Sequence, residues 1–539
     1  MFMISVFSSK EPIVNTRSAG SYNIFLKLFC YILIAYCVFI RCYLYVYHKD
    51  LWLDESAIAD AIYEASWSDL LAGRLPRMQS CPLAFAIINK LLSYITSYSP
   101  YVLYFLPTVA GISIAFLIYH FGMKLYGVRF AASGLTIYSL LFMPLYYSSE
   151  FKPYIFDFLF TIVLFGNLFV DIRKNDACRV FLSRKYPLLF AVSWLCSSTA
   201  IVCAAAIGIT IFVYLCLSRR FTFILLILKL AKLYCPFVIF AGLYYFLFLR
   251  QGASGGMYKF WKIGFIPSNP SEIPQWCNTV LKSVFYGLTT TIYGSVLSNI
   301  MLCLAILGLV TAFMTKNKKY ELIAFAVLSV IVCVLAIKVY PIGLPVGMHG
   351  ARLVFYILPV IIFFAALGIC SIVNISCKLQ RRYQFFIVVF TVTIALFGVI
   401  QSGAVHFKNR IHVEDSFQMY QTVLEKYNPN SDLIVAYNMV EHSFTYWKIF
   451  NSQQNNLPFV SIPRDKLITL KEDLFDLIGK KNFENKKRIF FLFTHRDPRA
   501  TNNVKNYLIK HNIPLQEFKW YGAELLIVNL ENLAMDSRI

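Results

Sequence analysis

Charged residues are scarce in this sequence. Only 14% of its 539 residues are Asp, Glu, Lys or Arg, whereas 58% are apolar. Because soluble globular domains carry about 25% charged and about 45 to 50% apolar residues, this composition excludes an ordinary soluble enzyme and predicts an α-helical polytopic membrane protein. The surplus of 50 Lys and Arg over 28 Asp and Glu is then explained by basic cytoplasmic loops and anionic lipid headgroups, so we predict no nucleic-acid partner.

Motifs for metal ribbons, redox chemistry and nucleotides are also missing. The 14 cysteines include no C-x-x-C pair, which argues against zinc ribbons and thioredoxin-like sites. None lies beyond Cys377, so the polar C-terminal region contains no disulfide. That region also lacks a G-x-G-x-x-G motif and a P-loop, and we assign it no nucleotide.

Long apolar runs fill the first 400 or so residues. The run over 23–47 is too long for a signal-peptide core and is followed by no small-residue cleavage site, so it predicts a retained transmembrane helix. The run over 187–217 has basic residues at both ends, which predicts a hairpin of short helices turning near 197–199. Segment 82–97 is short and contains Lys90, and we interpret it as a helix at the outer face. Further runs cover 101–126, 130–147, 153–171, 221–249, 295–314, 321–338, 353–372 and 384–402, which gives about eleven spans.

The polar tail predicts a second domain. Strand-like segments at 432–437, 488–494 and 523–529 alternate with helix-like segments at 414–426, 439–449, 466–478 and 499–511. This alternation predicts a small parallel α/β layer. We therefore divide the chain into a membrane domain, 1–404, and a soluble α/β domain, 405–539. Basic clusters in alternate loops predict an N-terminus in the cytoplasm and a tail on the outer, extracytoplasmic side of the membrane.

The outer loop after the first span contains two adjacent acids, Asp54 and Glu55. They precede apolar residues at near-helical spacing, so they stand at the start of a helix at the membrane surface. A purely structural role is open for both, with Asp54 as the N-cap and Glu55 favoured by the helix dipole. The alternative is a catalytic carboxylate.

A second outer group of charges lies between two spans, in Tyr146-Tyr147-Ser148-Ser149-Glu150-Phe151-Lys152-Pro153-Tyr154. Asp157 follows inside the next apolar run, where a carboxylate is costly and suggests a site. The structural alternative is a Glu150–Lys152 pair at the interface, with Asp157 bonded to a neighbouring helix.

A third outer segment runs from Tyr340-Pro341 to Arg352, at the mouth of a late span. Arg352 either reaches a lipid headgroup or holds a phosphate with its two-pronged guanidinium group. The aromatic loop 250–276 is either an interfacial belt or the wall of a sugar cleft.

Taken in this order, the motifs resemble those of membrane glycosyltransferases of the C-type (GT-C) fold. The similar group is the broad family 39, which includes protein O-mannosyltransferases and the lipid A aminoarabinose transferase. The resemblance rests on Trp52-Leu53-Asp54-Glu55, on Tyr147-Ser148-Ser149-Glu150-Phe151-Lys152-x-Tyr154, on the 197–199 turn and on Tyr340-Pro341…Arg352-Leu353. Pro153 stands where close bacterial relatives commonly have Gln.

The resemblance implies transfer of a sugar from a polyprenyl-phosphate donor to an acceptor hydroxyl at the outer face of the bacterial inner membrane. Outer loops 48–100, 148–153, 250–276 and 339–352 would form the catalytic face. Asp54 matches the family's general base, and a glycan, lipid or protein would be the acceptor. The resemblance also implies roles for the other residues. Glu150 would take part in catalysis or bind a metal, and Glu55 would bind a metal if Mg, Mn or Zn is used. Substrate binding would fall to Lys152, Arg352, Asp157 and Tyr340.

Two other classes of function stay open at this stage. A transporter or flippase of lipid-linked glycans would suit the broken spans and Asp157, but the sequence shows no internal repeat and its acids cluster on one face. An envelope-assembly scaffold would use the soluble tail to bind a partner.

Overall fold

The computed structural model describes most of the chain. The described residues are 16–47, 50–76, 81–96, 99–218, 222–246, 262–286, 294–315, 318–338, 352–353, 355–376, 415–437, 440–450, 457–470, 473–483, 485–494 and 498–530. The predicted span over 384–402 therefore lies outside the described residues, as do Tyr340 and most of its loop.

Helices form the membrane part, and within the described residues six are long and apolar enough to cross a bilayer. These six are α2 (Thr16–Val46), α6 (Pro100–Tyr126), α9 (Tyr154–Asp171), α12 (Ala200–Leu217), α13 (Phe223–Tyr244) and α18 (Lys319–Lys338). The other described helices of this part are α3 (Leu53–Glu64), α4 (Trp67–Leu71), α5 (Leu83–Ile95), α7 (Val128–Leu140), α8 (Phe142–Tyr147), α10 (Ala177–Phe181), α11 (Lys185–Cys196), α16 (Ile273–Tyr286), α17 (Gly294–Met314) and α19 (Leu358–Ser376). The prediction of a polytopic helical protein is confirmed.

Two predictions about the path of the chain are settled by local structure. The hairpin turn is confirmed, because α11 ends at Cys196 and α12 begins at Ala200. The run over 130–147 is not one helix, however, since Leu141 has an extended backbone between α7 and α8. Pro144 explains the break, because its ring clashes with the carbonyl four residues earlier, at Leu140, and it has no N–H to donate.

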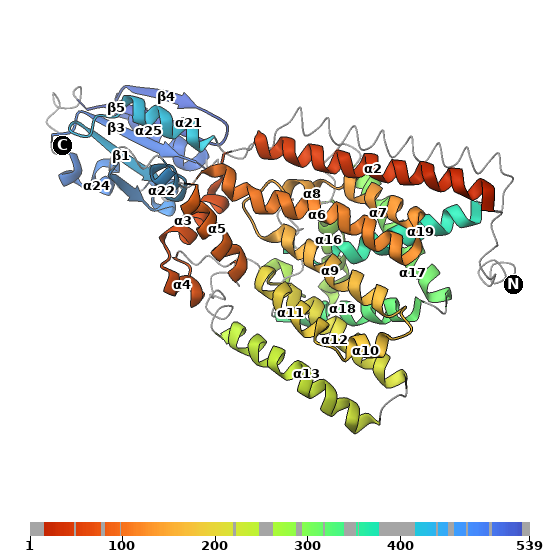
Figure 1. The fold of residues 1–539 in the computed structure, drawn as a ribbon. Helices are drawn as coiled ribbons and strands as arrows, with labels where there is room; N and C mark the ends of the chain where they lie inside the picture. The colour runs from red at the N-terminus through yellow and green to blue at the C-terminus, as the bar shows by residue number, and fades with distance from the viewer. Residues whose placement is uncertain are drawn as a thin grey trace.

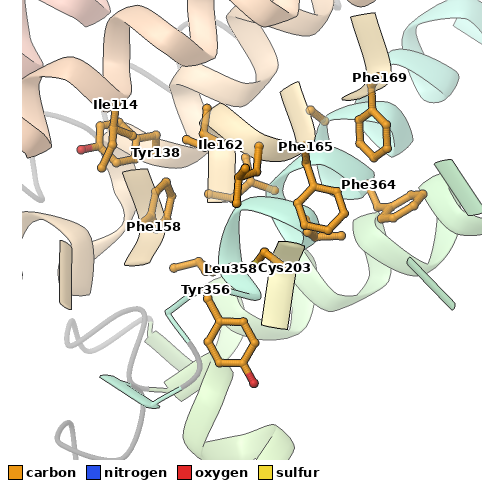
Figure 2. Close-up of a cluster of buried hydrophobic side chains, with 14 of the residues drawn as sticks. Ile114, Tyr138, Phe158, Ile162, Phe165, Phe169, Cys203, Tyr356, Leu358 and Phe364 are labelled. Carbon is orange, nitrogen blue, oxygen red and sulfur yellow. The ribbon is translucent and has the colours of Figure 1, made fainter. Parts of the chain in front are cut away.

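Helix α9 lies at the centre of the membrane part, whereas α13 lies at its edge (Figure 1). In their most apolar windows, 61% of α9 is buried against 6% of α13. Phe158, Ile162, Phe165 and Phe169 recur on one face of α9 at helical spacing and pack into the core shown in Figure 2.

The C-terminal domain is a mixed sheet with helices. Its elements are α21 (Ser416–Lys426), β1 (Asp432–Tyr437), α22 (Glu441–Phe450), β2 (Phe459–Ile462), α23 (Arg464–Thr469), α24 (Leu474–Ile478), β3 (Arg488–Phe493), α25 (Pro498–Lys510), β4 (Leu515–Lys519) and β5 (Glu524–Asn529). The strand order is β2-β1-β3-β5-β4. The three predicted strands correspond to β1, β3 and β5, so the prediction of a small α/β domain is confirmed.

The prediction of a wholly parallel sheet was wrong. β1 is parallel to β2 and to β3, but β5 is antiparallel to both β3 and β4. The cause is the connection, because α25 carries the chain to β4, which lies two positions from β3 in the sheet. A tight turn then brings β5 back into the gap, and a hairpin of this kind must be antiparallel.

The two parts of the molecule share a hydrophobic core. Leu51, Ile58 and Phe85 of the membrane part belong to the same buried cluster as Tyr420 and Phe444 of the C-terminal domain. In Figure 1, α22 lies directly against α3, on the side of the molecule where α2 ends. Helix α3 is therefore enclosed between the membrane helices and the soluble domain.

Candidate active site

Glu55 joins the first turn of α3 to the segment between α8 and α9. Its side chain is fully buried, one oxygen accepts the Trp52 N–H at 3.3 Å, and the other accepts the Phe151 N–H at 2.5 Å. A Glu in the first turn that accepts the N-cap N–H stabilises the start of a helix. The N-cap residue is Trp52, so the N-cap position that we allowed for Asp54 was wrong, and Glu55 completes the cap from the first turn of the helix.

Glu150 lies beside the same helix start. It is fully buried, and its Oε2 accepts the indole N–H of Trp52 at 3.0 Å. Trp52 therefore connects both glutamates through its backbone and its ring. The Lys152 ammonium group, which the structural alternative paired with Glu150, contacts Asp54, and the charge of Glu150 also acts on it.

Lys152 and Arg352 converge on Asp54. The Lys152 Nζ donates to the Asp54 backbone carbonyl at 2.6 Å and lies 4.0 Å from its Oδ2. The Arg352 Nη1 donates to the same Oδ2 at 3.3 Å, although 298 residues separate the two side chains along the chain. Three of the predicted site residues, from three parts of the sequence, are therefore in contact.

The exposure of these three groups differs in a way that bears on chemistry. The side chains of Lys152 and Arg352 are 5% and 10% exposed, whereas that of Asp54 is 38% exposed. Burial lowers the pKa of Lys152, and the Asp54 carboxylate opposes this effect. An incoming molecule thus meets Asp54 first, with two buried cations directly behind it.

Aromatic rings support the buried guanidinium group. The Arg352 Cζ stands 5.4 Å from the centre of the Tyr154 ring, which places it within cation–π range. The Tyr154 ring packs edge-on against Tyr147, which in turn packs edge-on against Phe355. Tyr147 and Tyr154 belong to the second sequence motif, but only the structure reveals them as the wall of the arginine site.

Asp157 belongs to a different part of the structure. It lies one turn into α9, where its Oδ1 accepts a 2.5 Å hydrogen bond from the Ser197 hydroxyl at the hairpin turn. The Ser197 hydroxyl also lies 3.3 Å from that of Thr199. This arrangement is the structural alternative that we weighed for Asp157, and it fixes the turn between α11 and α12.

Glu55 and Glu150 are also the predicted metal ligands. No group of three His, Cys, Asp or Glu side chains suited to a metal ion occurs among the described residues. Glu55 already directs both oxygens at backbone N–H groups, so it fits a structural role better than metal ligation. Metal binding by Glu55 and Glu150 stays a prediction.

Lys90 caps the end of α3, a role that the sequence did not reveal. Its ammonium group donates to the carbonyls of Ile62 and Tyr63 at 3.0 Å each and also to that of Ala65, at the end of α3. A cation at a helix C-terminus satisfies free carbonyls and the helix dipole. The signal was a lysine within an apolar helix, which indicates a buried polar partner.

The comparisons with known proteins gave structural likeness only. No protein-family model and no curated protein matches the chain. ArnT from Cupriavidus metallidurans bound to undecaprenyl phosphate resembles it over 95% of this chain and 98% of that chain, with 11% identity and a TM-score of 0.46. A second similar structure is the archaeal oligosaccharyltransferase AglB from Archaeoglobus fulgidus in complex with an inhibitory peptide and a dolichol-phosphate. The likeness covers 93% of this chain and 74% of that chain, with 10% identity and a TM-score of 0.43. At these values the likeness carries no conclusion about activity, and the resemblance to GT-C enzymes rests on the sequence motifs.

Proposed function

We propose that this protein is an integral-membrane glycosyltransferase. It transfers a sugar from a polyprenyl-phosphate donor to a hydroxyl group at the outer face of the cytoplasmic membrane. The observation that carries the proposal is the convergence of two buried cations on one accessible carboxylate. This is the pair of functions that the reaction needs, namely an anion site for the leaving phosphate and a base for the acceptor.

The cations account for phosphate binding. Arg352 offers a planar set of N–H donors, and Lys152 offers a compact positive charge. In the free protein Asp54 occupies both of them. A donor phosphate would replace the Asp54 carboxylate on Arg352, and the carboxylate would then be free to accept a hydrogen bond from the acceptor hydroxyl.

The proposed transfer is a single displacement at the anomeric carbon of the sugar. The acceptor oxygen forms a bond to that carbon while the bond from the carbon to the phosphate oxygen breaks. The hydroxyl proton passes to Asp54, and the bonding electrons leave with the polyprenyl phosphate. Lys152 and Arg352 stabilise the negative charge that develops on the phosphate as it departs.

An Asp54→Asn substitution tests the proposed base. Asparagine preserves the shape of the side chain but accepts no proton, so we expect transfer to fall by about 10²-fold to 10⁴-fold. The measurement is mass spectrometry of surface glycans from cells that lack the gene and carry either the wild-type or the variant protein. The wild type should restore one sugar residue that the Asp54→Asn protein does not restore.

Glu64→Gln is the matched control, since Glu64 is an exposed acid on the same helix. It should restore the sugar as well as the wild type does. Full activity of Asp54→Asn would remove Asp54 from the reaction. A flippase would be favoured by a different result: the glycan keeps the same sugar composition but crosses the membrane only when the wild-type protein is present.

A further inference from the structure

The C-terminal domain contacts the helix that carries the proposed base. Helix α3 presents Asp54 and Glu55 toward the membrane part, while Ser56 and Asp60 face α22. The Ser56 and Ser443 hydroxyls lie 3.1 Å apart, and the Asp60 Oδ2 lies 3.4 Å from the His442 Nδ1. Since Ser56 and Asp60 are four residues apart, they lie on the same face of the helix.

The Ser56 contact leads directly to the turn that holds Asp54. The Ser56 hydroxyl is 3.1 Å from the carbonyl oxygens of both Trp52 and Leu53, the residues immediately before Asp54. Ser443 thus connects the soluble domain to the first turn of α3 through one hydroxyl group. Ser56, Asp60 and Ser443 are fully buried, so water does not compete for these contacts.

The same domain also holds the segment that leads into α3. The Asp50 carboxylate accepts the Phe417 N–H at 2.9 Å, in the first turn of α21, and the Ser416 hydroxyl donates to the Leu51 carbonyl at 3.2 Å. A carboxylate that accepts a first-turn N–H caps a helix. Asp50 of the membrane part therefore caps α21 of the soluble domain.

We infer that α22 positions the base: His442 and Ser443 of the C-terminal domain hold α3 so that Asp54 faces the phosphate site. This role rests on the proposed glycosyl transfer. It assigns the soluble domain a part in the reaction that involves no contact with the donor phosphate. His442 and Ser443 act through α3, so they are positioning residues.

His442→Ala and Ser443→Ala test this role in the full-length protein. Because a small displacement of a reacting group has large effects on rate, we expect each substitution to slow sugar transfer by about tenfold or more. Binding of undecaprenyl phosphate to the purified protein should stay within about twofold of wild type, since Lys152 and Arg352 are unchanged. His442→Asn should restore most of the rate, because an asparagine amide can donate from near the Nδ1 position.

Glu441→Gln is the matched control on the same helix, since Glu441 faces Ser461 and not α3. It should leave both transfer and binding unchanged. Wild-type transfer rates in His442→Ala and Ser443→Ala would overturn the positioning role. An equal loss of binding and transfer, with no rescue by His442→Asn, would likewise overturn it in favour of a general structural role.

Hydrogen exchange separates this inference from the proposed function. Loss of the α22 contacts should speed amide exchange in α3, whatever reaction the protein performs. If the wild type transfers no sugar, the proposed function fails. Faster exchange across 53–64 in the two alanine variants would still support the hold of α22 on α3, and unchanged exchange would overturn it.

Discussion

At the scale of single residues, burial separates the acids of this site by role. Glu55 and Glu150 are fully buried and directed at N–H donors, whereas Asp54 keeps more than a third of its side chain exposed beside two cations. A base must reach its substrate, so the accessible acid is the one suited to proton transfer. The sequence places Asp54 and Glu55 side by side but cannot assign these roles, because they depend on contacts with Phe151 and Arg352 from distant segments.

Lys152 makes donor binding sensitive to alkaline pH. Burial lowers its pKa below the usual value of about 10.5. The ammonium form, which would hold the phosphate, is lost as the pH rises through this lowered pKa. We therefore expect the KM for the donor to rise on the alkaline side at a lower pH than an ordinary lysine would give.

Lys152→Arg provides the comparison for this effect. The guanidinium group stays charged throughout the range, so the alkaline rise in KM should move to higher pH in this variant. The measurement is the donor KM as a function of pH in both proteins. Identical alkaline limbs would mean that Lys152 does not hold the phosphate.

At the scale of elements, local signals predicted much of the fold. Apolar length identified most of the long helices, and the basic flanks of 187–217 identified the hairpin, since both depend on nearby residues. The break caused by Pro144 was also available in the sequence but was outweighed by the apolar run around it. The order of β5 and β4 in the sheet could not be predicted from the sequence, because strand pairing depends on tertiary contacts and not on the pattern within a strand.

Two glycines determine how closely α17 and α19 approach. A Cβ atom at Gly368 would lie 2.1 Å from the Leu304 carbonyl oxygen, and one at Gly308 would lie 1.8 Å from that of Phe364. Only a residue without a side chain fits at such a crossing, as is common between membrane helices. The rigidity of α19 matters for function, because Arg352 and Phe355 lie just before its start.

Gly368→Ala should lower the melting temperature of the purified protein, since the helices must separate to admit a methyl group. Overpacking of this kind costs about 1 to 3 kcal/mol. Gly208→Ala in α12 is the control, because its Cβ would meet nothing within 4 Å, and alanine favours a helix over glycine. It should leave the melting temperature unchanged or raise it. Equal stability of the two variants would contradict the close crossing of α17 and α19.

At the scale of the whole molecule, α9 separates two groups of charges. The proposed site surrounds its first residue, Tyr154, while Asp171 at its last residue binds Lys174 and Lys185. Eighteen residues make a helix of about 27 Å, close to the roughly 30 Å of bilayer hydrocarbon. This length fits the two groups of charges lying at opposite faces of a bilayer, and which face is cytoplasmic stays a prediction from the basic loops.

The soluble domain lies beside the proposed site, packed against α3. Its sequence predicted strands and helices but gave no indication of a role, because none of its segments carries a known chemical motif. The role inferred for α22 comes from contacts between residues nearly 400 positions apart, such as Ser56 and Ser443. Contacts at such separation follow from the fold as a whole and have no local signature.

The central claim is that Lys152 and Arg352 hold the donor phosphate while Asp54 serves as the base. It is tested most directly by measuring undecaprenyl phosphate binding to the wild-type, Asp54→Asn and Arg352→Ala proteins, each of which is also assayed for sugar transfer. Asp54→Asn should bind the lipid phosphate at least as tightly as the wild type, because the competing carboxylate is gone, and yet transfer no sugar. Arg352→Ala should weaken binding by about tenfold or more, as expected for a lost charge-assisted contact. Wild-type affinity in Arg352→Ala, or loss of lipid binding in Asp54→Asn, would contradict the account.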